Sequence, residues 1–123
     1  MNIIIGINAN HADSSAVLFI DNELIFGIEE ERLNRIKHWS GFPENSIREC
    51  LKYVDKYDIQ EIDVAINTNI FSNIKEKVYF TFKNYTFGQK KSEIYKRIKK
   101  KLNLKNLINN KFSKYKFKIH YID

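Results

Sequence analysis

Residues 8–15, with the sequence NANHADSS, form a run of small polar residues between two apolar segments. If the flanking segments pair as a hairpin, the turn directs successive backbone N–H groups and short hydroxyls toward one point, an arrangement that holds phosphate. His11 adds an imidazole that can donate to a phosphate oxygen or transfer a proton near neutral pH. Asn, Asp and Ser are also ordinary turn residues, so the same composition is consistent with a loop that has only a structural role.

A second candidate segment, residues 29–38 (EEERLNRIKH), places three carboxylates beside Arg32, Arg35, Lys37 and His38. Arg and Lys form strong charge-assisted hydrogen bonds with anions, so one of them could reach a phosphate held by residues 8–15. The alternative is that this segment is a solvated edge, as most runs of charged residues are.

The sequence lacks the common motifs for metal and covalent chemistry. It has no Cys-x-x-Cys, His-Glu-x-x-His, Walker-type lysine loop or Ser-His-Asp arrangement, and His11, His38 and His120 do not have the spacing of metal ligands. We therefore expect no self-contained metal site. The single Cys50 excludes an internal disulfide, and no segment resembles a secretion signal or the roughly 20 apolar residues of a membrane span. We expect a cytoplasmic protein with no membrane partner.

Hydrophobic patterning predicts the elements that position these residues. Residues 2–8 are typical of a buried strand, and residues 15–20 and 23–29 of a hairpin that turns at Asp21-Asn22. Three antiparallel strands therefore open the predicted fold. Residues 29–42 have no clean period and are predicted to begin as strand and to end as loop.

A helix and a further strand follow. Pro43 suits the first position of a helix, where its missing N–H costs nothing. The apolar stripe of an amphipathic helix comes next, at Ile47, Cys50, Leu51 and Val54. Residues 61–68 then predict a buried strand, and a strand that follows a crossover helix implies a parallel partner. A chain of 123 residues has room for one domain, so we predict a single α/β domain over residues 1–123.

Residues 69–113 lead to a last predicted strand at 114–123 and lie within the most basic part of the chain. Residues 1–74 hold 6 Lys/Arg against 12 Asp/Glu, whereas residues 75–118 hold 15 against 2. Apolar stripes within 71–85 and 94–102 predict two helices, so we interpret residues 69–113 as a basic helical insertion with solvated lysines. The alternative is a nucleic-acid contact surface that uses the interleaved aromatic residues Tyr79, Phe80, Phe82, Tyr85 and Phe87 for stacking. We do not expect nucleic acid as the partner, because most of these aromatics fit a helix core better.

One long segment, GINANHADSSAVLFIDNELIFGIEEERLNRIKHWSGFPENSIRECL, resembles the N-terminal segment of the O-carbamoyltransferases that decorate antibiotics and nodulation factors. The shared pattern is a short strand, an asparagine, a histidine followed by Asp-x-Ala/Ser-Ala, a hairpin, Glu-Glu-Glu-Arg, Arg-x-Lys-His and Phe-Pro. The match is close over residues 2–66. The resemblance implies an actin-like, ribonuclease H-like half-domain. It also implies ATP-dependent carbamoyl transfer from carbamoyl phosphate, through a carbamoyl-adenylate, to a hydroxyl of an acceptor.

The resemblance assigns roles to the polar residues of both candidate segments. The family's loop histidine corresponds to His11 and the lysine of its Arg-x-Lys-His segment to Lys37, so these two are the expected catalytic residues. The expected substrate-binding residues are those on the phosphate-side loop and the basic segment, namely Asn8, Asp13, Ser14, Ser15, Arg32 and Arg35.

The chain also departs from the family pattern. In the family, the strand that resembles FKIHYID runs into a His-His-x-x-x-His metal motif, and the sequence stops at Asp123 before that motif. We also expect the rest of the nucleotide-binding lobe and the C-terminal transferase domain to lie outside this sequence. We therefore expect carbamoyl phosphate and the missing C-terminal polypeptide as partners, no tight binding of ATP or a divalent metal, and no activity from this chain alone. A fragment of a sugar-kinase-like phosphotransferase remains an alternative, disfavoured because the Arg-x-Lys-His segment has no counterpart there.

Overall fold

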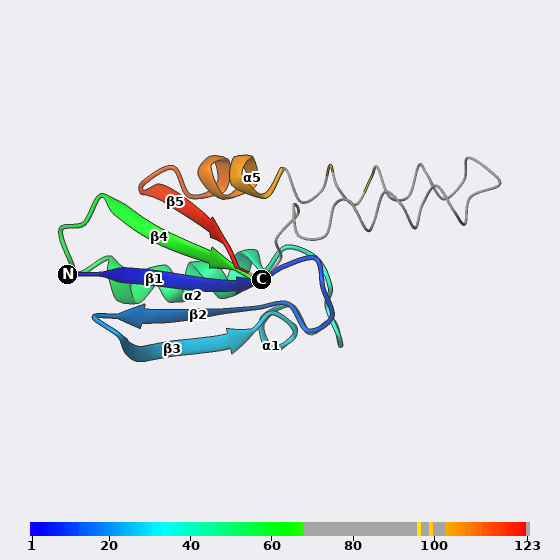
Figure 1. Cartoon of the computed structure of the whole chain (residues 1–123). Helices are drawn as coiled ribbons and strands as arrows, with labels where there is room; N and C mark the ends of the chain where they lie inside the picture. The colour runs from blue at the N-terminus through cyan, green and yellow to red at the C-terminus, as the bar shows by residue number, and fades with distance from the viewer. Residues whose placement is uncertain (68–95, 97–98, 100–102, 123) are drawn as a thin grey trace.

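The computed structural model describes residues 1–67, 96, 99 and 103–122, and this part of the chain forms a mixed five-stranded sheet (Figure 1). In chain order the strands are β1 (Ile3–Asn8), β2 (Ser15–Ile20), β3 (Glu23–Glu29), β4 (Glu61–Ile66) and β5 (Lys116–Tyr121). Their order across the sheet is β3-β2-β1-β4-β5. Strand β2 is antiparallel to β1 and β3, whereas β4 is parallel to β1 and β5. The predicted α/β fold is confirmed.

The hairpin between β2 and β3 forms as the sequence predicts. Asp21 and Asn22 have φ angles of 49° and 70°, the left-handed conformation that a two-residue hairpin turn requires at both central positions. Apolar side chains alternate between buried and half-buried along β1 and β2, which places one face of the sheet in the core.

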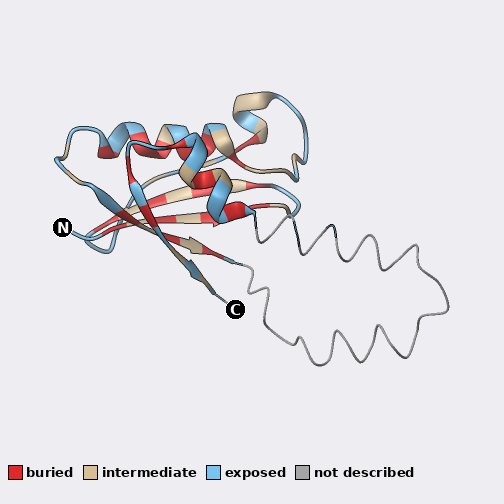
Figure 2. Ribbon diagram, turned by 90° about the horizontal axis from the view of Figure 1, so that it is seen from above, coloured by how far each residue is buried: buried red, intermediate tan, exposed pale blue. Residues whose placement is uncertain are grey.

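Helices α2 (Glu44–Val54) and α5 (Leu104–Lys111) lie on the same face of the sheet (Figure 2). The predicted stripe of α2 is buried against the sheet, and α5 buries Leu104 and Ile108. An ion pair of 2.8 Å between Lys111 and Glu44 joins the two helices at the surface. Neither α2 nor α5 covers the opposite face of the sheet, where the residues of β1 and β2 are half-buried in the described part of the chain.

Two expectations for the segment between β3 and α2 are corrected. A four-residue helix, α1 (Glu31–Asn34), interrupts the predicted strand-to-loop segment and ends at Arg35, whose φ is 62°. Main-chain bonds from Leu33 and Asn34 to the carbonyl of Glu30 hold this turn. It has no apolar stripe, so hydrophobic patterning does not predict it. Pro43 is the cap residue before α2 and not its first residue, since its ψ of 63° lies outside the helical range.

The predicted last strand is confirmed as β5, parallel to β4 over six residue pairs. Of the predicted helical insertion at 69–113, residues 104–111 are helical as α5, and Lys96 and Lys99 are also helical and exposed. The apolar stripes within 71–85 and 94–102 lie outside the described residues, so the insertion as a whole stays a prediction. None of the helices that the structure describes has both the length and the apolar character needed to cross a membrane.

Gly6 offers a test of the packing between β1 and β2. It faces Val17 across the two strands, and a Cβ atom at position 6 would lie 2.8 Å from Val17 Cγ1. We expect Gly6→Ala to lower the free energy of unfolding by about 0.5–1.5 kcal/mol, because the Val17 side chain must leave its preferred rotamer to make room. Urea denaturation measures the change.

Gly27→Ala is the matched control, because its new Cβ would meet Val17 Cγ2 at 3.4 Å, an ordinary contact. Adding Val17→Ala to Gly6→Ala should recover part of the loss if the two side chains compete for one space. Equal stability of Gly6→Ala and Gly27→Ala would contradict this account.

Candidate functional site

The loop between β1 and β2, residues 9–14, is bent and held by Asn8. The Asn8 side-chain amide donates to the carbonyls of Ala12, at 3.1 Å, and Asp13, at 3.2 Å. Asn10 and Asp13 have φ angles of 56° and 57°, which short polar side chains tolerate better than others. Asn8 therefore fixes the conformation of the loop that carries His11. We call residues 9–14 the first loop.

A second loop, residues 35–42, packs against the first loop. The Ser14 N–H donates to the Trp39 carbonyl at 2.9 Å, and the Asn10 N–H donates to the Gly41 carbonyl at 3.2 Å. Ser14 Oγ lies 2.7 Å from the Gly41 oxygen and 3.1 Å from the His11 oxygen. Ser14 is 1% exposed, so its polar groups join the two loops and do not face a ligand.

Asp13 and His38 make a side-chain contact between the two loops. His38 Nδ1 lies 2.8 Å from Asp13 Oδ1, and the main-chain N–H of His38 donates to Glu31 Oε2 at 2.8 Å. The hydrogen bond with Asp13 and the negative charge of that carboxylate raise the pKa of the His38 imidazole. Both side chains are exposed, so the pair is an ion pair at the surface when His38 is protonated.

The same contact creates a three-residue cluster that the sequence spacing did not predict. Ligand-type atoms of Asp13, Glu31 and His38 lie within 4.8 Å of one another. The fold brings these residues together from both loops and the start of α1. The hydrogen bonds that His38 makes with Asp13 and Glu31 account for this arrangement without an ion.

The two expected catalytic residues, His11 and Lys37, lie exposed on the two joined loops. Lys37 precedes His38, whose ring contacts Asp13, and Asp13 is two residues from His11. The loops that carry His11 and Lys37 are thus in contact, while their sharing of one anion stays a prediction.

The arginines of the basic segment are also exposed. Arg32 makes a long ion pair of 3.9 Å with Glu29, and Arg35 ends α1. Both side chains remain accessible to an anion from solvent.

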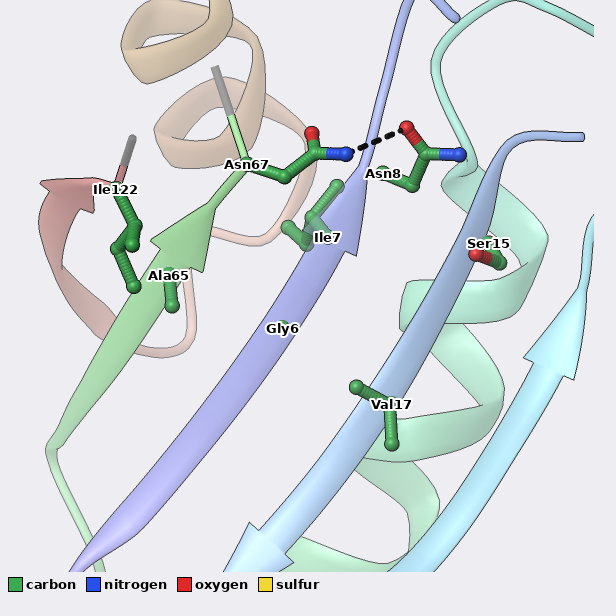
Figure 3. A pocket seen from close by; sticks show the side chains of 8 residues that line it. All are labelled: Gly6, Ile7, Asn8, Ser15, Val17, Ala65, Asn67 and Ile122. Carbon is green, nitrogen blue, oxygen red and sulfur yellow. Dashed lines mark hydrogen bonds between the residues drawn. The ribbon is translucent and has the colours of Figure 1, made fainter. Parts of the chain in front are cut away.

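A pocket of about 350 Å³ opens beside the first loop, on the face of the sheet turned away from α2 (Figure 3). It lies at the carboxyl ends of β1 and β4, the place where open α/β sheets bind ligands. Of the predicted residues, Asn8 and Ser15 line it; the others that line it are Gly6, Ile7, Val17, Ala65, Asn67 and Ile122.

Asn67 lines the pocket but is not among the residues predicted for the site, although the sequence contains a signal for it. Its Nδ2 donates to Asn8 Oδ1 at 3.0 Å, which joins the ends of β4 and β1 (Figure 3). Each asparagine ends or directly follows a buried strand, and carboxyl ends of parallel neighbours meet at one edge of a sheet. The parallel pairing that the sequence predicted therefore implied this contact.

Glu30 is a second residue whose environment the sequence did not reveal. The charged segment 29–38 was open to interpretation as a solvated edge, yet Glu30 is 2% exposed. Its carboxylate accepts hydrogen bonds from Asn45 and Ser46 at the start of α2.

The Asp13–His38 pair predicts a pH-dependent contribution to stability. Because the pKa of His38 is higher in the folded state, the contribution is complete below the unfolded pKa and is lost as pH rises through the raised value. We expect Asp13→Asn to lower the His38 pKa, measured by NMR titration of the ring protons. The difference in thermal stability between parent and variant should be largest at roughly pH 5–6, where Asp is ionised and His protonated.

Asp58→Asn removes an equal charge from an exposed position between α2 and β4 and serves as the control. An Asp13→Asn variant whose His38 titrates as in the parent would show that the contact does not persist in solution.

Comparison of the sequence with known proteins identifies the family of this chain. The family described as Carbamoyltransferase N-terminus matches residues 3–122. The chain is 54% identical over 41 residues to "Nodulation protein NolNO" of Sinorhizobium fredii. The aligned segment covers 33% of this chain and 6% of that protein. It is 41% identical over 66 residues to an uncharacterized protein of Synechocystis sp.. This aligned segment covers 54% of this chain and 11% of that protein. The matched part thus spans about a tenth or less of these relatives. The chain belongs to the carbamoyltransferase family, and its sequence corresponds to the N-terminal domain of that family.

Proposed function

We propose that this chain contributes half of the carbamoyl phosphate site of an O-carbamoyltransferase, with His11 and Lys37 as the residues that contact the substrate. The observation that carries the proposal is the junction of the first and second loops through Ser14, Gly41 and the Asp13–His38 pair. It brings the loop with the histidine against the loop with the lysine, at the edge of the sheet where β1 ends.

The topology supports the fold that the family resemblance implies. A sheet of order 3-2-1-4-5, whose first three strands are antiparallel and whose last two are parallel to the first, suits an actin-like, ribonuclease H-like half-domain. In such a sheet β1 is the boundary between the antiparallel and parallel parts. Its carboxyl end, at Asn8, is where a ligand has access to loops from both parts.

The proposed chemistry of the site is anion binding and proton handling. Carbamoyl phosphate is a small dianion that needs several convergent donors. The N–H groups of Asn10 and Ser14 already donate to carbonyls of the second loop. The Lys37 ammonium and the His11 imidazole are therefore the proposed donors to the phosphate oxygens, and His11 is also able to exchange a proton with them.

The other predicted residues take supporting roles in this proposal. Asn8 and Ser14 hold the first loop, and Asp13 holds the second loop through His38. Ser15 faces the pocket, where it is available to a larger part of the substrate or to the acceptor. Arg32 and Arg35 are exposed and add positive charge that attracts the dianion.

ATP and a divalent metal are the remaining requirements that the family implies. In the described part of the chain, the group of His, Asp and Glu residues with ligand atoms close together is Asp13, Glu31 and His38. Asp13 contacts the ring of His38, and Glu31 accepts from the main-chain N–H of His38. Both carboxylates are already hydrogen-bonded to His38, so we assign no step to a metal at this group. We propose that the polypeptide that makes the relatives longer supplies the metal, the adenosine pocket and the acceptor site.

Binding of carbamoyl phosphate to the chain tests the substrate contact. We expect weak binding, with a Kd of about 1 mM, because one lobe leaves the anion half solvated. Substitutions His11→Ala and Lys37→Ala should each weaken it about tenfold or more, as loss of a charge-assisted hydrogen bond does. Isothermal titration calorimetry gives both values.

The control is Lys52→Ala, which removes an exposed lysine of α2 that pairs with Glu49 away from both loops. If all three variants bind alike, the anion is held by net charge and not by this site.

Catalysis tests the half-site itself. Purified residues 1–123 should not convert ATP and carbamoyl phosphate to pyrophosphate, because a cation and an oriented adenosine are required at the α-phosphate. Adding the polypeptide that follows this domain in a longer relative should restore pyrophosphate release. Turnover by the chain alone that is abolished by His11→Ala would instead identify a complete enzyme.

A further inference from the structure

Glu30 is a buried carboxylate whose oxygen atoms are satisfied by neutral donors. Oε1 accepts from the N–H of Asn45 at 3.2 Å and from its Nδ2 at 2.8 Å. Oε2 accepts from the N–H of Ser46 at 2.8 Å and from its Oγ at 2.7 Å. A buried charge is tolerated when it is hydrogen-bonded in this way, so the site is built for a carboxylate.

The position of these donors explains why a carboxylate is there. Asn45 and Ser46 are the second and third residues of α2, whose first N–H groups have no partner within the helix. A cap side chain normally accepts from one of them, but the cap residue of α2 is Pro43, which makes no side-chain cap bond. Glu30 supplies both acceptors from another segment, and its negative charge also suits the positive end of the helix dipole.

The main chain of Glu30 bonds to the first loop and to α1, so Glu30 connects the start of α2 to both loops. Its N–H donates to the carbonyl of Ser14 at 2.8 Å, which ties it to the first loop. Its carbonyl accepts from the N–H groups of Leu33 and Asn34 at 3.0 Å, which holds α1 and hence the start of the second loop. Rotation of the chain at Glu30 would therefore move Lys37 and His38 relative to the first loop.

We propose that Glu30 is a positioning residue, whose buried carboxylate fixes the second loop on the end of α2 so that Lys37 is held beside the first loop. The consequence for carbamoyl phosphate rests on the proposed function, whereas the positioning of the loop does not. Glu30 acts through Lys37 and His38 and touches no substrate itself.

The change Glu30→Gln keeps the shape of the side chain and replaces one of its two acceptor oxygens with an NH₂ donor. An amide has one acceptor oxygen, and its NH₂ group would face donors of Asn45 or Ser46. The chain must then rotate or leave buried donors unpaired, and either outcome loosens residues 31–38. A milder variant, Ser46→Ala, removes the Oγ donor alone and leaves the charge in place.

The first experiment needs no ligand and measures the NMR titration of His38 in the full chain. If Glu30 positions the second loop, Glu30→Gln should separate His38 from Asp13 and lower the His38 pKa toward that of an unperturbed histidine, with Ser46→Ala intermediate. The matched control is Ile108→Val, a core change in α5 that lowers thermal stability without touching either loop. All titrations are made at a temperature at which every variant is folded.

A His38 pKa that falls in Glu30→Gln but not in Ile108→Val supports the proposal. An unchanged His38 pKa in both Glu30→Gln and Ser46→Ala overturns the proposal. A residue that only stabilises the fold would leave the His38–Asp13 contact intact in the folded protein. If Glu30→Gln does not fold, Ser46→Ala alone decides between these results.

The second experiment measures carbamoyl phosphate affinity in the same variants. We expect Glu30→Gln to weaken binding by about tenfold, since misplacing a group by 1 Å can cost up to about 100-fold. Equal affinity in Glu30→Gln and the parent would overturn the link between positioning and binding. If the parent itself does not bind carbamoyl phosphate, the proposed function fails, and the His38 titration still decides whether Glu30 positions the loop.

Discussion

The form of the candidate site depends on Ser14, a buried residue whose polar groups all bond to the segment that follows β3. Its N–H donates to Trp39, its hydroxyl lies 2.7 Å from the Gly41 oxygen, and its carbonyl accepts from Glu30. Leaving one such buried group unpaired costs about 1–3 kcal/mol, so the two loops form as one unit. The left-handed conformation of Asp13 is part of the same unit, because it turns the chain into Ser14. Two loops that are separate in sequence thereby become a single surface.

The uneven charge of the chain is partly resolved by contacts within the fold. Residues near the end of the chain pair with acidic residues of segment 1–74: Lys111 with Glu44, Lys114 with Asp55, Lys116 with Glu61 and, when its imidazole is protonated, His120 with Asp63. Lys114 and Tyr115 both donate to Asp55, and these bonds lower the pKa of its carboxyl. Each exposed pair adds little stability. Together they engage Lys111, Lys114 and Lys116 of the basic segment within the fold.

The sequence predicted the elements whose signal is local. The strands, the Asp21-Asn22 turn and the stripe of α2 follow from side-chain period and turn chemistry, which act over a few residues. The contacts that build the site act over long separations, as between Glu30 and Ser46 or Asn8 and Asn67. A run of three glutamates gives no indication of which one is buried, because that depends on where α2 begins. The short helix α1 was missed for a different reason: local main-chain bonds to Glu30 hold it, and no apolar period marks it.

The arrangement of the site is the reason we propose weak binding of carbamoyl phosphate by this chain alone. His11, Lys37 and the arginines of the basic segment are exposed, and the adjacent pocket opens on the face of the sheet turned away from α2. The attraction between a lysine and a phosphate oxygen is several times weaker when water surrounds it than near a protein surface that excludes water. A second surface placed against this face would exclude water from the pocket and the loops together, because Asn8 belongs to both. Because Asn8 both lines the pocket and holds the first loop, we propose that a surface covering the pocket would also strengthen the proposed anion site.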